Sequence, residues 1–184
     1  MTSHRLHVVY EYGRDLRPHG SAYVRLLRPL AHPAMRDALE VSFSRFYGGQ
    51  VVDAVIVDRL WRPADVTLVR ARELVSATRR AGAHLIYALD DDLLSAERIE
   101  ADVHRAVAEH WLREADGAVV TTHALKDRLG NVNPRVIVVP NALDERLLPG
   151  DVCIQPPGDR VVIGYMGTLT HEEDLLLIAP ALRE

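Results

Sequence analysis

Three consecutive carboxylates follow an apolar run in the stretch YALDDDLL, residues 87–94. Adjacent carboxylates repel one another, so Asp90, Asp91 and Asp92 need water, a cation, hydrogen-bond donors or a structural reason for their position. They could hold a magnesium or manganese ion, which prefers hard oxygen ligands. They could also accept hydrogen bonds in a sugar-binding cleft, or favour the start of the next helix through its dipole. A D-x-D triplet by itself is a weak metal motif, so all three readings stay open.

The segments that must position this run alternate between apolar and amphipathic patterns. The apolar runs are continuous and do not alternate with polar residues, which is typical of parallel strands covered on both faces. Strands are expected at Leu6–Tyr10, Leu39–Phe43, Ala54–Asp58, His84–Leu89, Ala118–Thr121 and Arg135–Val139, with helices at Ser21–Leu30, from Pro63-Ala64-Asp65 to about Arg80, from Ser95 through Trp111, and at Ala124–Leu129. The pattern predicts a doubly wound, Rossmann-like α/β domain with a parallel sheet.

Two of the expected helices carry more detailed predictions. Asp65 is a plausible N-cap of the second helix, where Val66, Val69 and Leu74 would share one stripe. In the third helix the apolar positions step by four residues, which places them on one face. These positions are Ile99, Val103, Val107 and Trp111.

The domain organisation changes after the last expected strand. We expect a Rossmann-like domain over residues 1–146 and a linker rich in proline and glycine over 147–160. Residues 161–184 then read as a fresh strand, loop and helix, a C-terminal βα extension that has too little surface to form a core alone. Its apolar side chains therefore predict that it folds back on its own Rossmann-like domain or is exchanged with a second copy of the chain, giving a homodimer; of the two we prefer exchange.

The position of the ligand site follows from the fold class, because open α/β sheets bind ligands beyond the carboxyl ends of their strands. This rule selects the loop Arg14–Gly20, the run Asp90–Asp92, Thr121-Thr122-His123 and Pro140-Asn141. Gly20 would let the start of a helix approach an anion or a sugar hydroxyl, but from the residues alone we favour a simple turn.

Composition limits the classes of function. The 184 residues carry a formal net charge of -4, which argues against nucleic acid as the main partner. One cysteine, nine histidines without metal-ligand spacing and no dinucleotide or Walker motif lead us to expect no metal and no cofactor. The start of the chain lacks a long apolar stretch, and arginine exceeds lysine strongly, so a cytoplasmic, bacterial protein without membrane insertion is expected.

A basic segment surrounds the first loop and helix. It could meet a phosphorylated or lipid-linked acceptor, or an anionic membrane surface. A solvated helix face in an arginine-rich protein is the simpler interpretation, which we favour from the sequence. The segment contains Arg14, Arg17, Arg25, Arg28, His32 and Arg36.

The stretch ADGAVVTTHALKDRLGNVNPRVIVVPNALD, residues 115–144, resembles the final βαβ unit of the N-terminal domain of "group 1" GT-B glycosyltransferases. IGYMGTLTHEEDLLLIAPALRE, residues 163–184, is similar to the opening βα unit of their C-terminal domain, as in bacterial surface-polysaccharide transferases. YALDDDLL is similar to an acidic stretch of the same subgroup. The resemblance is good from about residue 85 onward and weak before it.

The resemblance implies two Rossmann-like domains across a cleft, an acceptor side at the N-terminus and a sugar-nucleotide side at the C-terminus. Such enzymes hold the diphosphate with side chains and helix termini, so the acidic run is expected to bond a sugar and not a metal. By position, Gly20 and Ser21 would line the acceptor side, and Asp90, Asp91 and Asp92 would lie at the strand edge. Thr122 and Asn141 would border the cleft, and Gly167 and Thr168 would belong to the loop that approaches the donor diphosphate.

The departures from the family pattern bear on activity. Ala142 replaces the usual glycine after Pro-Asn, and the basic pair and E-x(7)-E segment that hold the donor would lie beyond Glu184. Without those cations the main electrostatic stabilisation of the leaving diphosphate is missing. We therefore expect part of a glycosyltransferase that acts on a glycan or lipid-linked acceptor with a sugar nucleotide, inactive as this chain alone. The alternative is a non-catalytic module that binds a glycan or a partner subunit. A receiver-like domain is disfavoured by the spacing of its required residues.

Overall fold

The computed structural model describes residues 3–62, 67–95, 101–142, 144–147, 164 and 172–181 of the chain. The chain divides into two units, Met1–Leu147 and Leu148–Glu184. The first unit contains the sheet and both sites described below. The predicted N-cap Asp65, the expected strand near residues 161–165, and Gly167 and Thr168 lie outside the described residues.

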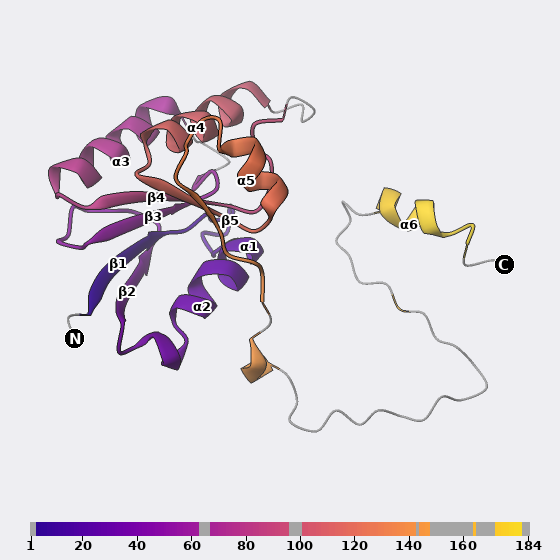
Figure 1. The fold of residues 1–184 in the computed structure, drawn as a ribbon, viewed down its shortest axis with the longest axis horizontal. Helices are drawn as coiled ribbons and strands as arrows, with labels where there is room; N and C mark the ends of the chain where they lie inside the picture. Colours follow the sequence, from indigo (N-terminus) through magenta and orange to yellow (C-terminus); the bar gives the residue numbers. More distant parts are fainter. Residues whose placement is uncertain are drawn as a thin grey trace. The chain divides into compact units, whose positions relative to one another are not determined.

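The first unit is built on one six-stranded sheet whose neighbouring strands are all parallel (Figure 1). The strands are β1 His4–Val9, β2 Leu39–Ser44, β3 Ala54–Asp58, β4 His84–Leu89, β5 Gly117–Val120 and β6 Val136–Val138, in the spatial order β2-β1-β3-β4-β5-β6. The predicted α/β class with a parallel, Rossmann-like sheet is thereby confirmed, and the six predicted strands agree with the observed ones to within two residues at each end.

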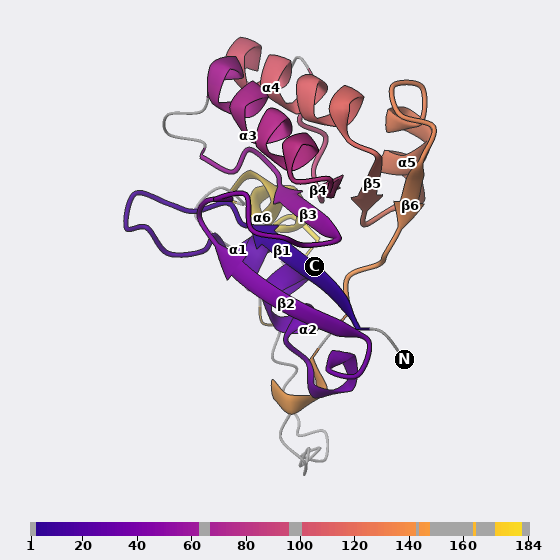
Figure 2. The same cartoon turned by 90° about the vertical axis from the view of Figure 1, so that its left-hand side faces the viewer.

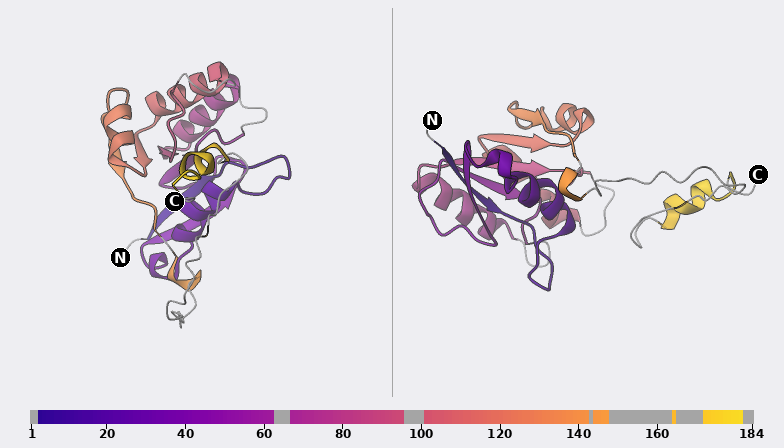
Figure 3. Two further views of the ribbon diagram at one scale, coloured as in Figure 1. Left: turned by 90° about the vertical axis from the view of Figure 1, so that its right-hand side faces the viewer. Right: turned by 90° about the horizontal axis from the view of Figure 1, so that it is seen from below.

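Helices cover both faces of the sheet. The helical segments are α1 Gly20–Ala22, η1 Tyr23–Leu27, α2 Arg28–Leu30, η2 Pro33–Met35, α3 Leu68–Arg80, α4 Ala101–Glu114, α5 His123–Leu129, η3 Glu145–Leu147 and, in the second unit, α6 Glu172–Ile178. Figures 2 and 3 show α3 and α4 on one side of the strands and the α1–α2 helix on the other.

Alternate residues of the strands feed two separate cores, as the pleat of a strand requires. Val9 and Val57 pack in the larger core with α3, α4 and α5. Val8 and Ile56, their immediate neighbours, pack in the smaller core with Leu26 of η1. Strands buried on both faces explain why their sequences read as continuous apolar runs.

The first helix contains a wide, π-helical turn with a clear cause in the sequence. Pro29 has no N–H to donate to the preceding turn, and the N–H of Arg28 instead reaches the carbonyl of Tyr23, five residues back. The helix then continues to Leu30, as predicted. Arg25 lies within this π-helical turn and Arg28 directly after it, and the two contact different partners at the two sites described below.

Two predictions about the later helices are wrong in detail. α3 begins at Leu68 with Thr67 as N-cap, whose hydroxyl accepts from the N–H of Arg70, and not at the Pro63-Ala64-Asp65 stretch. Val69 is exposed because it lies five residues from Leu74, off the buried i, i+3, i+4 face. Val103 is also exposed, one turn before the buried part of α4 that begins at Val107.

In the second unit, α6 exposes Leu175, Leu176, Leu177 and Ile178, with Leu177 80% exposed. No helix within the described residues is both long enough and apolar enough to span a membrane.

Candidate functional site

Polar side chains from three strands and the first helix meet at the carboxyl edge of the sheet. We call this cluster the strand-edge network. It lies where the order of the strands reverses, since β1 is flanked by β2 on one side and by β3 on the other. Such a switch point is where open α/β sheets bind ligands. The network consists of Glu11, Ser21, Arg25, Asp58, Arg59, Asp90 and Asp91.

Arg59, directly after β3, is the central cation of the network. Its Nε lies 3.2 Å from Glu11 Oε2, and its Nη1 lies 2.5 Å from Asp90 Oδ1 and 2.7 Å from Asp91 Oδ2. Burial opposes the charge, but Glu11, Asp91 and Asp90 outweigh it and raise the pKa of the Arg59 guanidinium. The side chain therefore stays protonated and ties the ends of β1, β3 and β4 together.

The backbone at Arg59 is strained. Arg59 has a φ of 46° and Trp61 a φ of 60°, left-handed values that side chains rarely adopt. The turn is held by the N–H of Leu60, which donates to Glu11 Oε2 at 3.0 Å. Each such residue costs about 1–3 kcal/mol, and strain of this kind concentrates at functional sites. It is an independent reason to treat this edge as the candidate site.

Asp58 is the most deeply buried member of the network, at 0% exposure. Its Oδ2 accepts from the N–H of Glu11 at 3.1 Å, while Oδ1 lies 3.7 Å from Nη1 of Arg25. Burial raises the pKa of Asp58 to about 7, with the neighbouring charge of Glu11 acting in the same direction. Asp58 therefore holds a proton below neutral pH.

The charges of the network do not cancel when every group is ionised. Four carboxylates face two guanidinium groups, and Arg25 Nη1 is shared between Asp58 and Asp90, 3.3 Å from the latter. The atoms Asp58 Oδ1 and Tyr87 OH are buried and make no hydrogen bond within the part of the chain that the structure describes. A proton on Asp58 reduces this surplus of negative charge.

The three aspartates of the acidic run have different roles. Asp90 is 15% exposed, and it accepts from the Ser21 hydroxyl and from Arg59; although burial opposes it, these donors lower the pKa of Asp90. Asp92 accepts from the N–H of Leu94 at 3.0 Å and pairs with Arg128 at 2.5 Å, so it serves the turn that follows.

Asp91 has one oxygen paired with Arg59 and is 46% exposed. It is therefore the member of the run that offers a carboxylate to a ligand. Asp90, by contrast, is not a surface group, because its carboxylate is an internal part of the network.

The other predicted site residues are brought to the same edge of the sheet by its topology but stay outside the network. Thr122 is the N-cap of α5, where its Oγ1 accepts from the N–H of Leu125 at 3.2 Å. Asn141 is exposed beyond β6. Gly20 begins α1, and a Cβ there would meet nothing within 4 Å, so this position does not require glycine for space. Ser21, by contrast, bonds Asp90 directly.

Sequence reasoning missed four members of the network: Glu11, Arg25, Asp58 and Arg59. A usable signal was present, since β1, β3 and β4 are each followed or ended by a charged residue at their carboxyl ends. The pairing of Arg25 with these residues could not be read from the sequence, because it depends on which way the irregular first helix faces.

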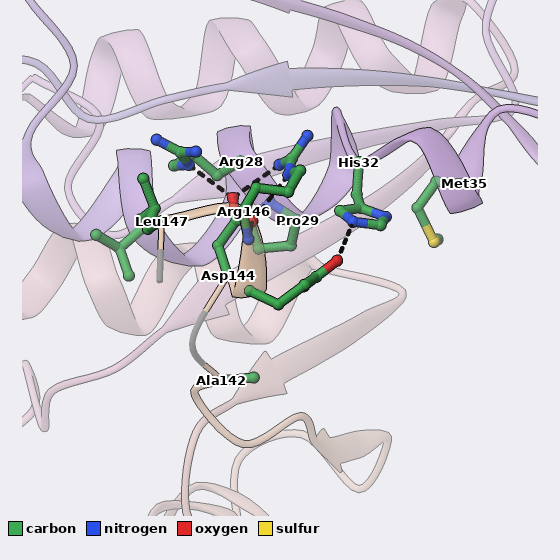
Figure 4. A pocket seen from close by; sticks show the side chains of 10 residues that line it. Arg28, Pro29, His32, Met35, Ala142, Asp144, Arg146 and Leu147 are labelled. Carbon is green, nitrogen blue, oxygen red and sulfur yellow. Dashed lines mark hydrogen bonds and ion pairs between the residues drawn. The ribbon is translucent and has the colours of Figure 1, made fainter. Parts of the chain in front are cut away.

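A second candidate site is a pocket of about 400 Å³ between the first helix and the segment after β6 (Figure 4). Arg28 Nε lies 2.9 Å from Asp144 Oδ2, and His32 Nε2 lies 2.8 Å from Glu145 Oε1. These pairs fix the 144–147 segment against the helix. Our preference for a solvated basic face is therefore wrong for Arg25, Arg28 and His32, which are bound to carboxylates.

His32, Asp144 and Glu145 lie close enough together to offer three ligand atoms to a metal ion. Their hydrogen bonds oppose this use. His32 Nδ1 accepts from the N–H of Ala34, so Nε2 carries the proton and donates to Glu145. Both carboxylate oxygens of Asp144 are bound by arginines. An ion would have to displace hydrogen bonds at each of the three residues, and the geometry favours ion pairs over a metal centre.

Compared with protein-family models, curated proteins and solved structures, the chain shows no match to any of them.

Proposed function

We propose that this chain forms the acceptor-side domain of a sugar-nucleotide-dependent glycosyltransferase of the GT-B type. The observation that carries the proposal is the hydrogen bond between Ser21 and Asp90, 69 positions apart in the sequence. The family resemblance assigns Ser21 to the acceptor side and Asp90 to the edge facing the donor sugar. Their contact at the switch point of the sheet supports one cleft that contains both.

In this proposal the network orients the polar groups that meet the sugar. Arg59 holds Asp91 with one oxygen bonded, so that the exposed part of the carboxylate can accept from an acceptor hydroxyl. Asp90 pairs with Arg59 and is itself paired with Arg25, which also contacts the buried Asp58, so these groups support the position of Arg59. The donor sugar nucleotide would be bound mainly by a second domain, which supplies the cations for the leaving diphosphate. The acceptor is a glycan or a lipid-linked glycan.

A non-catalytic glycan-binding module is the second candidate, and one feature favours it. The two guanidinium groups of the strand-edge network face four carboxylates, so the network has no surplus of positive charge for a diphosphate. Such an edge suits neutral sugar hydroxyls better than a nucleotide. Both candidates predict glycan binding at Asp91, and they differ in whether the complete gene product transfers a sugar.

Saturation-transfer NMR with a panel of mono- and oligosaccharides tests the binding part of the proposal. We expect at least one glycan to bind, and we expect Asp91→Asn to abolish its signal while Asp127→Asn, an exposed change on α5, leaves it intact. Calorimetry with UDP-, GDP- and dTDP-sugars should give no binding tighter than about millimolar, or about -4 kcal/mol. Micromolar binding of a sugar nucleotide would contradict the acceptor-side assignment, and so would a glycan signal that survives in Asp91→Asn.

A further inference from the structure

The pocket beside the first helix has an apolar lining that the strand-edge network does not use, and the two sites share no residue. Its walls come from the first helix and from the segment after β6. Val24 and Leu147 are 54% and 61% exposed, so much of this apolar surface faces solvent. The apolar lining residues are Val24, Pro29, Met35, Ala142 and Leu147 (Figure 4). The volume of about 400 Å³ lies in the range of small-molecule sites.

Two arginines converge on a single carboxylate at the pocket. Arg28 binds Asp144 through Nε, and Arg146 binds it in a bidentate manner through Nε at 2.8 Å and Nη2 at 2.7 Å. Hydrogen bonding from the Arg146 side chain has the largest effect on the pKa of Asp144 and lowers it, so this carboxylate stays ionised. Two guanidinium groups and one carboxylate leave one positive charge, and guanidinium forks match the geometry of oxyanions.

Glu145, whose hydrogen-bond partner His32 is neutral, adds a second negative charge at the edge of the pocket. Glu145 is 70% exposed, so water and salt screen its charge. Arg28, Asp144 and Arg146 are 23%, 12% and 37% exposed, so these three groups, with their one surplus positive charge, are less solvated than Glu145.

We propose that this pocket binds a small amphipathic oxyanion, in which an apolar chain or ring covers the exposed walls and a phosphate or carboxylate head meets Arg28 and Arg146. The charge complementarity selects an anion over a cation, and the apolar lining selects a ligand with a hydrophobic body over a free inorganic ion. The inference does not depend on the proposed glycosyltransferase function.

Calorimetry on the chain with butyl, hexyl and octyl phosphate, below their micelle concentrations, is the test. Burial of one CH₂ is worth about 0.8 kcal/mol, so the affinity should rise about fourfold for each added carbon. Octanoate should also bind, whereas octanol, inorganic phosphate and octyltrimethylammonium should each bind at least tenfold more weakly than octyl phosphate. An affinity independent of chain length, or octanol equal to octyl phosphate, would overturn the proposal.

Paired variants locate the site. Arg146→Gln should weaken octyl phosphate at least tenfold, because a hydrogen bond to a charged group is lost, while Arg113→Gln, an exposed arginine of α4, should not. Ala142→Trp should fill the pocket and abolish binding, with exposed Ala124→Trp on α5 as its control. Leu147→Glu should abolish binding by placing an anion at the wall. Undiminished binding in folded Ala142→Trp or Leu147→Glu refutes this location.

Discussion

The protonation of Asp58 gives the strand-edge network a measurable pH dependence. The carboxyl group has a pKa of about 7 in the native chain against 3.8 for an ordinary aspartate, a difference of about 3 pH units. Because the native pKa is the higher one, the native state binds more protons between these values, and stability falls as the pH rises from about 4 to about 7. The total loss corresponds to about 4 kcal/mol, of which about 3 kcal/mol falls between pH 5 and pH 9.

Asp58→Asn removes this titration, since the amide is neutral at every pH in the range. Urea unfolding followed by circular dichroism at pH 5, 6, 7, 8 and 9 gives the free energy of unfolding of both proteins. Relative to wild type, the asparagine variant should gain about 3 kcal/mol between pH 5 and pH 9. The free energies of the two proteins must be compared because His7 and His110 also titrate. Burial lowers the pKa values of both, so their titration makes stability rise with pH, opposite to the effect of Asp58.

Asp127→Asn is the matched control, because Asp127 is exposed on α5. Its free energy of unfolding should stay parallel to that of wild type across the range. Parallel curves for Asp58→Asn and wild type would show that Asp58 is ionised throughout. They would refute the reasoning that burial and the surplus of carboxylates hold a proton there.

Two further outcomes are expected. Arg59→Met should lower the free energy of unfolding, measured with urea, by about 3–5 kcal/mol, because it leaves Glu11 and Asp90 buried without their partner. The exposed control Arg113→Gln should cost less than about 0.5 kcal/mol. A loss in Arg59→Met no larger than that of the control would contradict the network's role. The intact chain should dimerise while a version ending at Leu147 stays monomeric, because α6 exposes Leu176 and Leu177; light scattering that finds both to be monomers rules this out.

The sequence predicts the sheet well because burial on both faces leaves a strong, local signal. The strand Ala54–Asp58 and the strand His84–Leu89 agree with the observed β3 and β4 residue for residue. Helix starts were less predictable. Thr67 and Asp65 are both good N-cap types, and only the path of the chain selects Thr67.

The site was predictable only in part, for a related reason. A position at the end of a strand is a local property, so the rule about strand ends selects Asp90 and Asp91, which both pair with Arg59 in the strand-edge network. Which of them is buried depends on Arg59, whose left-handed backbone conformation cannot be recognised from the sequence because the position is not a glycine. The partners of Arg25 and Arg28 likewise depend on the π-helical turn before Pro29, an irregularity that hydrophobic periodicity does not reveal.

Sugar transfer by the complete gene product is the decisive assay for the proposed function. The release of nucleoside diphosphate should be followed with UDP-, GDP- and dTDP-sugars, in the presence and absence of a panel of glycan acceptors. We expect release that depends on an acceptor for at least one donor, falls at least tenfold in Asp91→Asn and is retained in Asp127→Asn. A gene product that binds glycans but releases no diphosphate from any donor, or one whose transfer is unaffected by Asp91→Asn, would contradict it.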